Sequence, residues 1–237
     1  MNLKTLAAAR GLALTTLTSP EELAVNLAEQ VAEALRGAIR ERGIARLAVS
    51  GGRSPEPFLR CLDQLPLDWE RVAITLVDER WVPVSHPDSN AGMLRRCLPS
   101  ALERTALLPL FRGDSPAGDA RAAELDLASW LPLDVVVLGM GADGHCASLF
   151  AGQENLRDLL RGDSQVLCAP VRAADGSPRV TLTAATLRSA RLQLLAISGD
   201  DKYRTLCEAF SADSEMMPVA AFLAPPLHIF YSGDFDG

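Results

Sequence analysis

Short apolar stretches alternate along this chain with longer segments in which apolar residues recur at helical spacing. The short stretches predict strands, since a strand of about five residues that is buried on both faces is apolar throughout. These predicted strands cover 44–49, 72–77, 134–138, 192–197 and 227–231, with shorter extended pieces at 166–169 and 179–182. Further helices are predicted over 54–62, 89–98, 118–130 and 200–210, with a helical turn at 218–223.

The first long helix has boundaries that can be read from single residues. Ser19 is suited to the N-cap, Pro20 to the first helical position, and Glu22 to closing a capping box. Leu23, Leu27, Val31 and Leu35 then recur at helical spacing, and we expect the helix to end at Gly43.

Strands separated by helices are typical of a mostly parallel sheet wound in both directions. We therefore predict an α/β fold in which a single doubly wound, mostly parallel, Rossmann-like sheet is flanked by helices. No repeat or low-complexity linker divides the 237 residues, so residues 1–237 are predicted to form a single domain.

Composition narrows the classes of partner and the cellular compartment. The net charge of −7 leaves no basic excess for nucleic acid, although a small phosphorylated ligand needs only a few local cations. No apolar run approaches the roughly 20 residues of a membrane span, and the N-terminus has no apolar core typical of a signal peptide. Five widely spaced cysteines without a Cys-x-x-Cys pattern indicate free thiols in the cytoplasm and no structural metal.

Residues 134–150 carry the most information. A run of three valines is followed at once by Gly139, Gly141 and Gly144, and then by His145. The stretch 147–150 is predicted to be the first turn of a helix. Because ligands bind beyond the carboxyl ends of strands in open α/β sheets, this glycine loop is expected at a binding site.

The same segment permits two functional interpretations. Its spacing fits the dinucleotide pattern G-x-G-x-x-G, but Asp163 precedes the next predicted strand instead of ending it, and Asp143 would oppose a pyrophosphate. Alternatively, His145 stands at a helix N-terminus, whose positive end favours a neutral imidazole that accepts a proton as a general base. Asp143 would then orient the ring or cap the helix. A purely structural histidine is the third interpretation. Cys146 is predicted to point away from the ring.

A second cluster follows the strand that ends near residue 49. Ser50, Gly51, Gly52, Arg53 and Ser54 lead directly into a predicted helix start. Glycines allow close backbone approach, and a helix N-terminus offers free N–H donors, so this loop is suited to holding a phosphate group. A tight strand-to-helix turn without a ligand would have the same letters.

Charged residues also follow the other predicted strands. Asp78 and Arg80 come after the strand at 72–77, Arg179 lies at an extended piece, and Lys202 opens the helix after 192–197. Taken singly, each could be a solvated surface charge. Together they fall at the sheet edge where the glycine loops are expected.

In their order along the chain, these segments resemble the 6-phosphogluconolactonase family, which is close to the glucosamine-6-phosphate deaminases and isomerases. The resemblance covers nearly the whole chain and rests on Ser50-Gly51-Gly52-x-Ser54-Pro55, Asp78-Glu79-Arg80-x-Val82, Asp88-Ser89-Asn90, the segment from Leu138 through His145 to Phe150, Arg179-x-Thr181-Leu182 and Gly199-x-x-Lys202.

The resemblance implies hydrolysis of 6-phospho-D-glucono-1,5-lactone, the second step of the oxidative pentose phosphate pathway, without metal or cofactor. By this resemblance His145 activates water with support from Asp143, while N–H groups of the glycine loops, including Gly141 and Gly144, are expected to stabilise the oxyanion. The phosphate is expected against residues 50–54 with Arg179 and Lys202. Arg80 is expected to contact phosphate or hydroxyls, and Asp78 to hold Arg80 or bind the sugar. The partner is this small lactone, and the protein is expected as a monomer or small homo-oligomer.

Two departures and two rivals accompany the resemblance. Arg53 and Ala151 replace a polar residue and a proline that the family usually has. Amino-sugar phosphate deaminases typically follow the histidine segment with Phe-Asn-Glu-Pro and have tyrosine at position 80, whereas this chain has Ser148-Leu149-Phe150-Ala151 and Arg80. A non-enzymatic sugar-phosphate sensor commonly lacks the base that His145 supplies.

Overall fold

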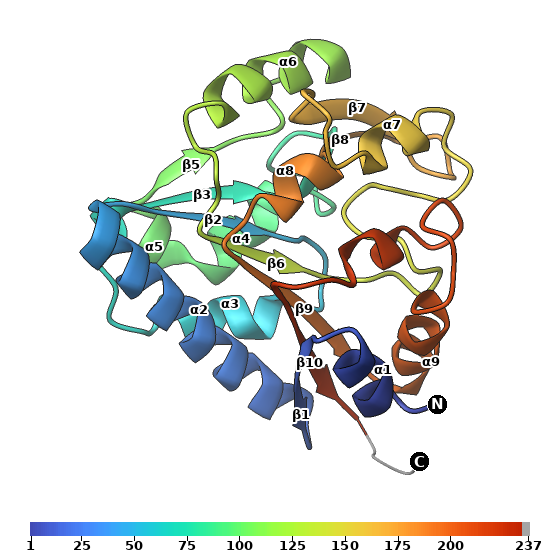
Figure 1. Cartoon of the computed structure of the whole chain (residues 1–237). Helices are drawn as coiled ribbons and strands as arrows, with labels where there is room; N and C mark the ends of the chain where they lie inside the picture. The colour runs from blue at the N-terminus through green and yellow to red at the C-terminus, as the bar shows by residue number, and fades with distance from the viewer. Residues whose placement is uncertain (234–237) are drawn as a thin grey trace.

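Seven parallel strands form the central sheet, with helices packed on both of its faces (Figure 1). The computed structural model describes residues 1–233. The order across the sheet is β1-β10-β9-β6-β2-β3-β5, and the strands are β1 (Ala13–Leu17), β2 (Ala45–Val49), β3 (Val72–Leu76), β5 (Ala106–Leu108), β6 (Val135–Leu138), β9 (Leu192–Ser198) and β10 (Leu227–Ser232).

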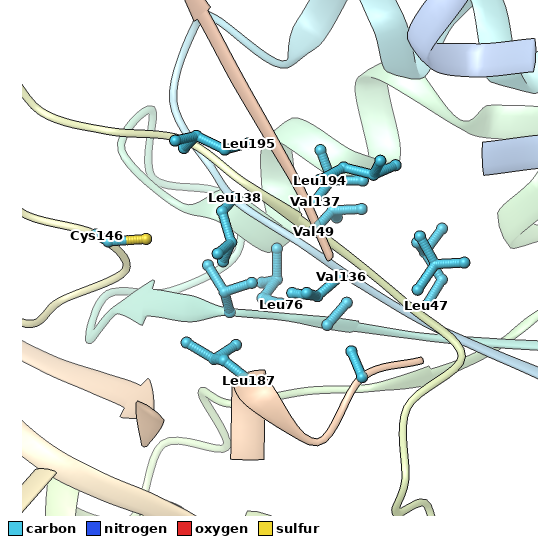
Figure 2. Packing of buried hydrophobic residues seen from close by; sticks show 14 of the residues in the cluster. Leu47, Val49, Leu76, Val136, Val137, Leu138, Cys146, Leu187, Leu194 and Leu195 are labelled. Carbon is cyan, nitrogen blue, oxygen red and sulfur yellow. The ribbon is translucent and has the colours of Figure 1, made fainter. Parts of the chain in front are cut away.

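The centre of this sheet is apolar because its middle strands are buried on both faces. Every residue of β3 and β6 is buried, and β2 has one partly exposed residue, Arg46. Figure 2 shows Leu47, Val49, Val137 and Leu194 from three neighbouring strands packed together. The apolar runs in the sequence therefore predicted strands correctly where the sheet is most deeply buried.

The helices connect these strands and close the layers. They are α1 (Leu3–Ala9), α2 (Pro20–Arg42), α3 (Glu56–Asp63), α4 (Asn90–Cys97), α5 (Pro99–Leu102), α6 (Pro116–Leu127), α7 (Leu156–Leu160), α8 (Ala184–Arg188) and α9 (Asp200–Ala209), with short 3-10 turns at Trp69–Arg71 and Pro218–Phe222. In Figure 1, α2 and α3 lie on one side of the sheet, whereas α1, α8 and α9 lie on the other. The predicted doubly wound α/β architecture is thus confirmed.

The predicted ends of α2 are confirmed with one change at the first turn. The Ser19 hydroxyl accepts a hydrogen bond from the N–H of Glu22 at 3.1 Å, and Gly43 ends the helix with a left-handed φ of 80°. The Glu22 carboxylate, however, reaches one residue beyond the expected partner and accepts from the N–H of Thr18 at 2.8 Å. The Ser19 hydroxyl therefore caps the first turn of the helix, and the Glu22 carboxylate ties the preceding residue, Thr18, to that turn.

A second, smaller sheet was not predicted. Its three antiparallel strands run in the order β4-β8-β7, with bounds Asp78–Arg80, Pro178–Leu182 and Cys168–Arg172. Only Val77 separates β4 from β3, and its N–H still donates a hydrogen bond to the carbonyl of Val49 on β2 at 3.0 Å. The small sheet therefore begins at the carboxyl edge of the large one.

The strand order places a switch point between β2 and β6. The chain leaves β2 toward β3, whereas it leaves β6 toward β9 on the other side. In doubly wound sheets the crevice beyond such a point is where ligands bind. The loops after these two strands, 50–55 and 139–145, are the two glycine-rich loops singled out in the sequence.

Two sequence predictions concern the chain as a whole. No helix within residues 1–233 is both long and apolar enough to cross a membrane. The assignment of residues 1–237 to a single domain stays a prediction, and its last four residues lie outside the described range.

Candidate active site

A cavity of about 260 Å³ opens at the switch point between β2 and β6. It gathers most of the residues that the sequence suggested. Those that line it are Ser50, Gly51, Gly52, Ser54, Asp78, Arg80, Gly141, His145, Arg179 and Lys202. The remaining three, Arg53, Asp143 and Gly144, do not line it.

His145 is held in a defined orientation by Asp143. Its Nδ1 lies 2.5 Å from Oδ1 of Asp143, and the same oxygen accepts the main-chain N–H of His145 at 3.2 Å. Partial burial acts to raise the pKa of Asp143, but the hydrogen bonds and charge of His145 outweigh it and lower that pKa below its ordinary value. Within residues 1–233 the other ring nitrogen, Nε2, has no hydrogen-bond partner, and the ring lines the cavity. His145 therefore presents one nitrogen to a ligand while an ionised carboxylate holds the other.

The prediction of a helix that starts after His145 is wrong. Residues 146–149 form a tight turn closed by a bridge between Cys146 and Leu149, and Ala147 has a left-handed φ of 52°. The next helix, α7, begins only at Leu156. The helix-dipole argument for a neutral imidazole therefore has no basis, and the glycine loop has no helix N-terminus to offer a pyrophosphate. Asp143 replaces the dipole as the group that controls the ring.

Two glycines are required here by close approach. A Cβ on Gly141 would overlap the imidazole of His145, and a Cβ on Gly51 would overlap the side-chain amide of Asn90. The N–H of Gly141 donates to the carbonyl of His145 at 2.9 Å, and the N–H of Gly144 donates to the carbonyl of Gly141 at 3.1 Å. Because these two donors are used within the loop, Gly141 and Gly144 shape the site and do not supply oxyanion contacts in this conformation.

The loop after β2 forms the opposite wall. Ser50 is fixed by two hydrogen bonds to the carbonyl of Val137, from its N–H at 3.0 Å and from its hydroxyl at 3.1 Å. Helix α3 begins at Glu56, two residues later than the predicted start, with Pro55 at the N-cap. Arg53 is exposed and lies outside the cavity lining, so a phosphate contact for Arg53 stays a prediction.

Asp78 is buried and does not hold Arg80. Its Oδ2 accepts a hydrogen bond from the hydroxyl of Ser148 at 2.5 Å and lies 3.9 Å from Nη1 of Arg179. Arg80 instead donates to the carbonyl of Asp88 at 2.6 Å. The carboxylate of Asp78 thus ties the histidine loop to the small sheet.

Arg80 and Arg179 face each other directly across β4 and β8. Like charges at such positions repel, which makes the arrangement unfavourable without a counter-charge. The Nε atoms of both side chains are buried without a hydrogen-bond partner. Burial lowers the pKa of the Arg179 guanidinium, Asp78 acts to raise it, and the charge of Arg80 lowers it further. Two adjacent cations with free donors are suited to binding an anion.

Lys202 supplies a third cation from another element. It lies in the first turn of α9, where a positive charge opposes the helix dipole, and burial lowers the pKa of its ammonium group. No carboxylate within residues 1–233 forms an ion pair with it. A bound anion would relieve both costs, so Lys202 is suited to a second anion contact in the same cavity.

Two neighbours of the site were not assigned a role from the sequence. Asn90 lines the cavity, and its buried Oδ1 has no hydrogen-bond partner, whereas its Nδ2 donates to the carbonyl of Asp78 at 2.9 Å. Phe150 packs its ring 4.7 Å from that of His145 and 5.7 Å from the guanidinium carbon of Arg179. Both residues belong to the quoted motifs, so their positions within those motifs were the available signal.

Other reactive side chains lie away from this chemistry. Cys146 is fully buried, and burial together with the charge of Asp78 raises the pKa of its thiol to about 12, so it remains protonated at neutral pH. His228 is bound to Thr15 at the edge of the large sheet, and His86 does not line the cavity. All five cysteines are free, and no cluster of three metal-binding side chains occurs among residues 1–233.

Comparison with known proteins shows which family this chain belongs to. The family model described as glucosamine-6-phosphate isomerases/6-phosphogluconolactonase matches residues 18–228. The chain is 45% identical to 6-phosphogluconolactonase of Pseudomonas aeruginosa over 93% of this chain and 95% of that protein, and 44% identical to that of Mesorhizobium japonicum over 89% and 91%. A crystal structure of a 6-phosphogluconolactonase from Shewanella baltica superposes with a TM-score of 0.88 at 31% identity, covering 94% of this chain and 98% of that one. This chain therefore belongs to the family of glucosamine-6-phosphate isomerases and 6-phosphogluconolactonases.

Proposed function

We propose that this chain hydrolyses 6-phospho-D-glucono-1,5-lactone to 6-phospho-D-gluconate, the second step of the oxidative pentose phosphate pathway. One observation carries the proposal. Within residues 1–233, the cavity has a histidine nitrogen without a hydrogen-bond partner on one side, and partly buried cations with free donors on the other. The first can take a proton from water, and the second can hold a phosphorylated substrate.

In the proposed mechanism, His145 acts as the general base. As the oxygen of water attacks the lactone carbonyl carbon, Nε2 of His145 takes a proton from that water. The Nδ1–H group stays hydrogen-bonded to the carboxylate of Asp143. The tetrahedral intermediate then collapses with cleavage of the bond between that carbon and the ring oxygen. His145 returns the proton to the leaving ring oxygen, so the base ends the cycle neutral.

The phosphate of the substrate is proposed to lie between Lys202, Arg179 and the loop 50–54, with Arg80 contacting phosphate or hydroxyls. Within residues 1–233, the N–H groups of Gly51, Gly52, Arg53 and Ser54 have no hydrogen-bond partner, so they are the loop donors left for phosphate or oxyanion. Asp78 lies beside Arg179 and lines the cavity, so its contact with the sugar stays a prediction.

A single assay with two substrates tests the function. Purified protein is mixed with freshly prepared 6-phosphogluconolactone, and acid release is followed against the buffer rate. Fast hydrolysis supports the proposal, and decay at the buffer rate contradicts it. Ammonia release from glucosamine 6-phosphate by the same sample would instead identify a deaminase, and phosphosugar binding without turnover would identify a sensor. The cytoplasmic location, the monomeric or small oligomeric state and the lack of nucleic-acid binding stay predictions from the sequence.

A further inference from the structure

Ser148 and Arg179 compete for the same carboxylate oxygen. The hydroxyl of Ser148 donates to Oδ2 of Asp78 at 2.5 Å, while Nη1 of Arg179 lies 3.9 Å from that same atom. A hydrogen bond to a charged carboxylate is short and strong, whereas an arginine and a carboxylate in full contact approach to about 2.8 Å, often through two bonds. The carboxylate of Asp78 is therefore hydrogen-bonded to Ser148 and only loosely paired with Arg179.

The position of Ser148 is fixed independently of this bond. The side chain is fully buried, and its main-chain N–H donates to Oγ1 of Thr181 at 3.2 Å. Thr181 lies on β8, the strand that also carries Arg179, and its register partner on β4 is Asp78. The hydroxyl of Ser148 is thus held at the carboxylate by the strand whose arginine it restrains.

Among residues 1–233, Arg179 makes no side-chain hydrogen bond and no ion pair other than the one with Asp78. The ring of Phe150 lies 5.7 Å from its guanidinium carbon, Arg80 faces it across the strands, and its buried Nε has no hydrogen bond. Only 18% of its side chain is exposed. A guanidinium in this position would pair fully with Asp78 if that carboxylate were free to move toward it.

We propose that Ser148 is a positioning residue that withholds Asp78 from Arg179, so that the charge of Arg179 stays available to the phosphate of the substrate. The inference rests on the proposed function, in which Arg179 meets that phosphate. In a chain without the hydroxyl, Asp78 closes on Arg179 and becomes an internal competitor of the phosphate. The pair formed by His145 and Asp143 is untouched by this change.

The test compares Ser148→Ala with the wild-type protein on phosphorylated and unphosphorylated gluconolactone. We expect KM for the phosphorylated lactone to rise about tenfold, the typical effect of one charged hydrogen bond. The KM for the unphosphorylated lactone and kcat should stay near the wild-type values. Thr75→Val is the control, because it removes another fully buried hydroxyl, on a residue outside the cavity lining.

A double-mutant cycle separates this role from a merely structural one. If Ser148 acts by restraining Asp78, then Ser148→Ala has no further effect on KM in an Asp78→Asn background. Equal effects in both backgrounds would overturn the inference. Ser148→Cys, which keeps the volume but has a weak donor, should shift KM in the same direction and serves if the alanine variant does not fold.

Binding of inorganic phosphate, measured by calorimetry, makes the two proposals separable. If the wild-type protein fails to hydrolyse the lactone but Ser148→Ala still weakens phosphate binding, the proposed function falls and the role of Ser148 stands. If the lactone is hydrolysed and the ratio of the two KM values is unchanged in Ser148→Ala, the role of Ser148 falls and the function stands.

Discussion

Replacing Asp143 by asparagine removes one charge from the site and leaves its shape. In the wild-type protein, Oδ1 of Asp143 accepts from both the ring Nδ1 and the main-chain N–H of His145. An asparagine would keep its carbonyl oxygen toward His145, because the main-chain N–H needs an acceptor. The ring tautomer should therefore be retained, and only the charge that stabilises the imidazolium during proton transfer is lost.

The size of the effect follows from the exposure of Asp143. A hydrogen bond to a charged group contributes about 1.5–3 kcal/mol and one to a neutral group about 0.5–1.5 kcal/mol, so the exchange costs about 1–2 kcal/mol. The side chain of Asp143 is 66% exposed, and solvent screening keeps the loss near the lower end of this range. We therefore expect kcat to fall about fivefold, whereas a buried triad aspartate in serine proteases costs about 10⁴-fold when it is exchanged for asparagine.

The assay is the initial rate of 6-phosphogluconolactone hydrolysis at saturating substrate, for wild-type protein and for Asp143→Asn. Asp143→Ala is the matched comparison, because it also removes the acceptor and should cost more than the asparagine exchange. A loss of about 10³-fold or more for Asp143→Asn would refute the screening argument. It would mean that the carboxylate becomes desolvated when substrate binds.

Three further predictions address the base, the phosphate site and stability. His145→Ala should lower kcat at least about 100-fold with unchanged thermal unfolding, and a nearly wild-type rate would contradict its role as base. Lys202→Met should raise KM for the phosphorylated lactone about 10- to 100-fold and leave KM for the unphosphorylated lactone within about twofold, with Arg204→Met on the exposed side of α9 as control. Burial acts to raise the pKa of Asp119, but hydrogen bonds from Arg112, Trp81 and the following N–H groups lower it below the ordinary value of an aspartate. The contribution of this carboxylate to stability is therefore present above that ordinary pKa and is lost as the pH falls through the lowered folded pKa. Denaturant unfolding of Asp119→Asn should accordingly differ most from wild type near neutral pH and converge with it in acid; a constant difference would show that the charge is irrelevant.

The large sheet could be predicted from the sequence because burial on both faces makes its central strands apolar throughout. The edge strand Ala13–Leu17 was missed, since its partly exposed residues give no such run. Strand β4 was also missed, because the letters Asp-Glu-Arg resemble a solvated loop and its pairing with β8 involves residues about 100 positions away. Local letters cannot encode a partner at that separation.

The sequence predicted which residues form the site better than it predicted the contacts among them. Strand ends and glycine loops indicated where His145, Arg179 and Lys202 would meet, and one cavity contains all three. The turn after His145 was mistaken for a helix because Ala-Ser-Leu-Phe suits one. The hydrogen bonds of Ser148 to Asp78 and Thr181 compensate for the helical bonds that the turn gives up.

Arg80 and Arg179 belong to the small antiparallel sheet, whereas His145 and Lys202 follow strands of the large one. The cavity is therefore complete only in molecules in which both sheets are folded and packed together. Small units open locally at lower free energy than the centre of a large sheet. Apparent affinity is reduced by the fraction of molecules in which the binding-competent arrangement is absent. Substitutions in β7 that loosen the small sheet should therefore weaken substrate binding from a distance, and ligand should slow amide exchange in β4 and β8 more than in β2 and β6.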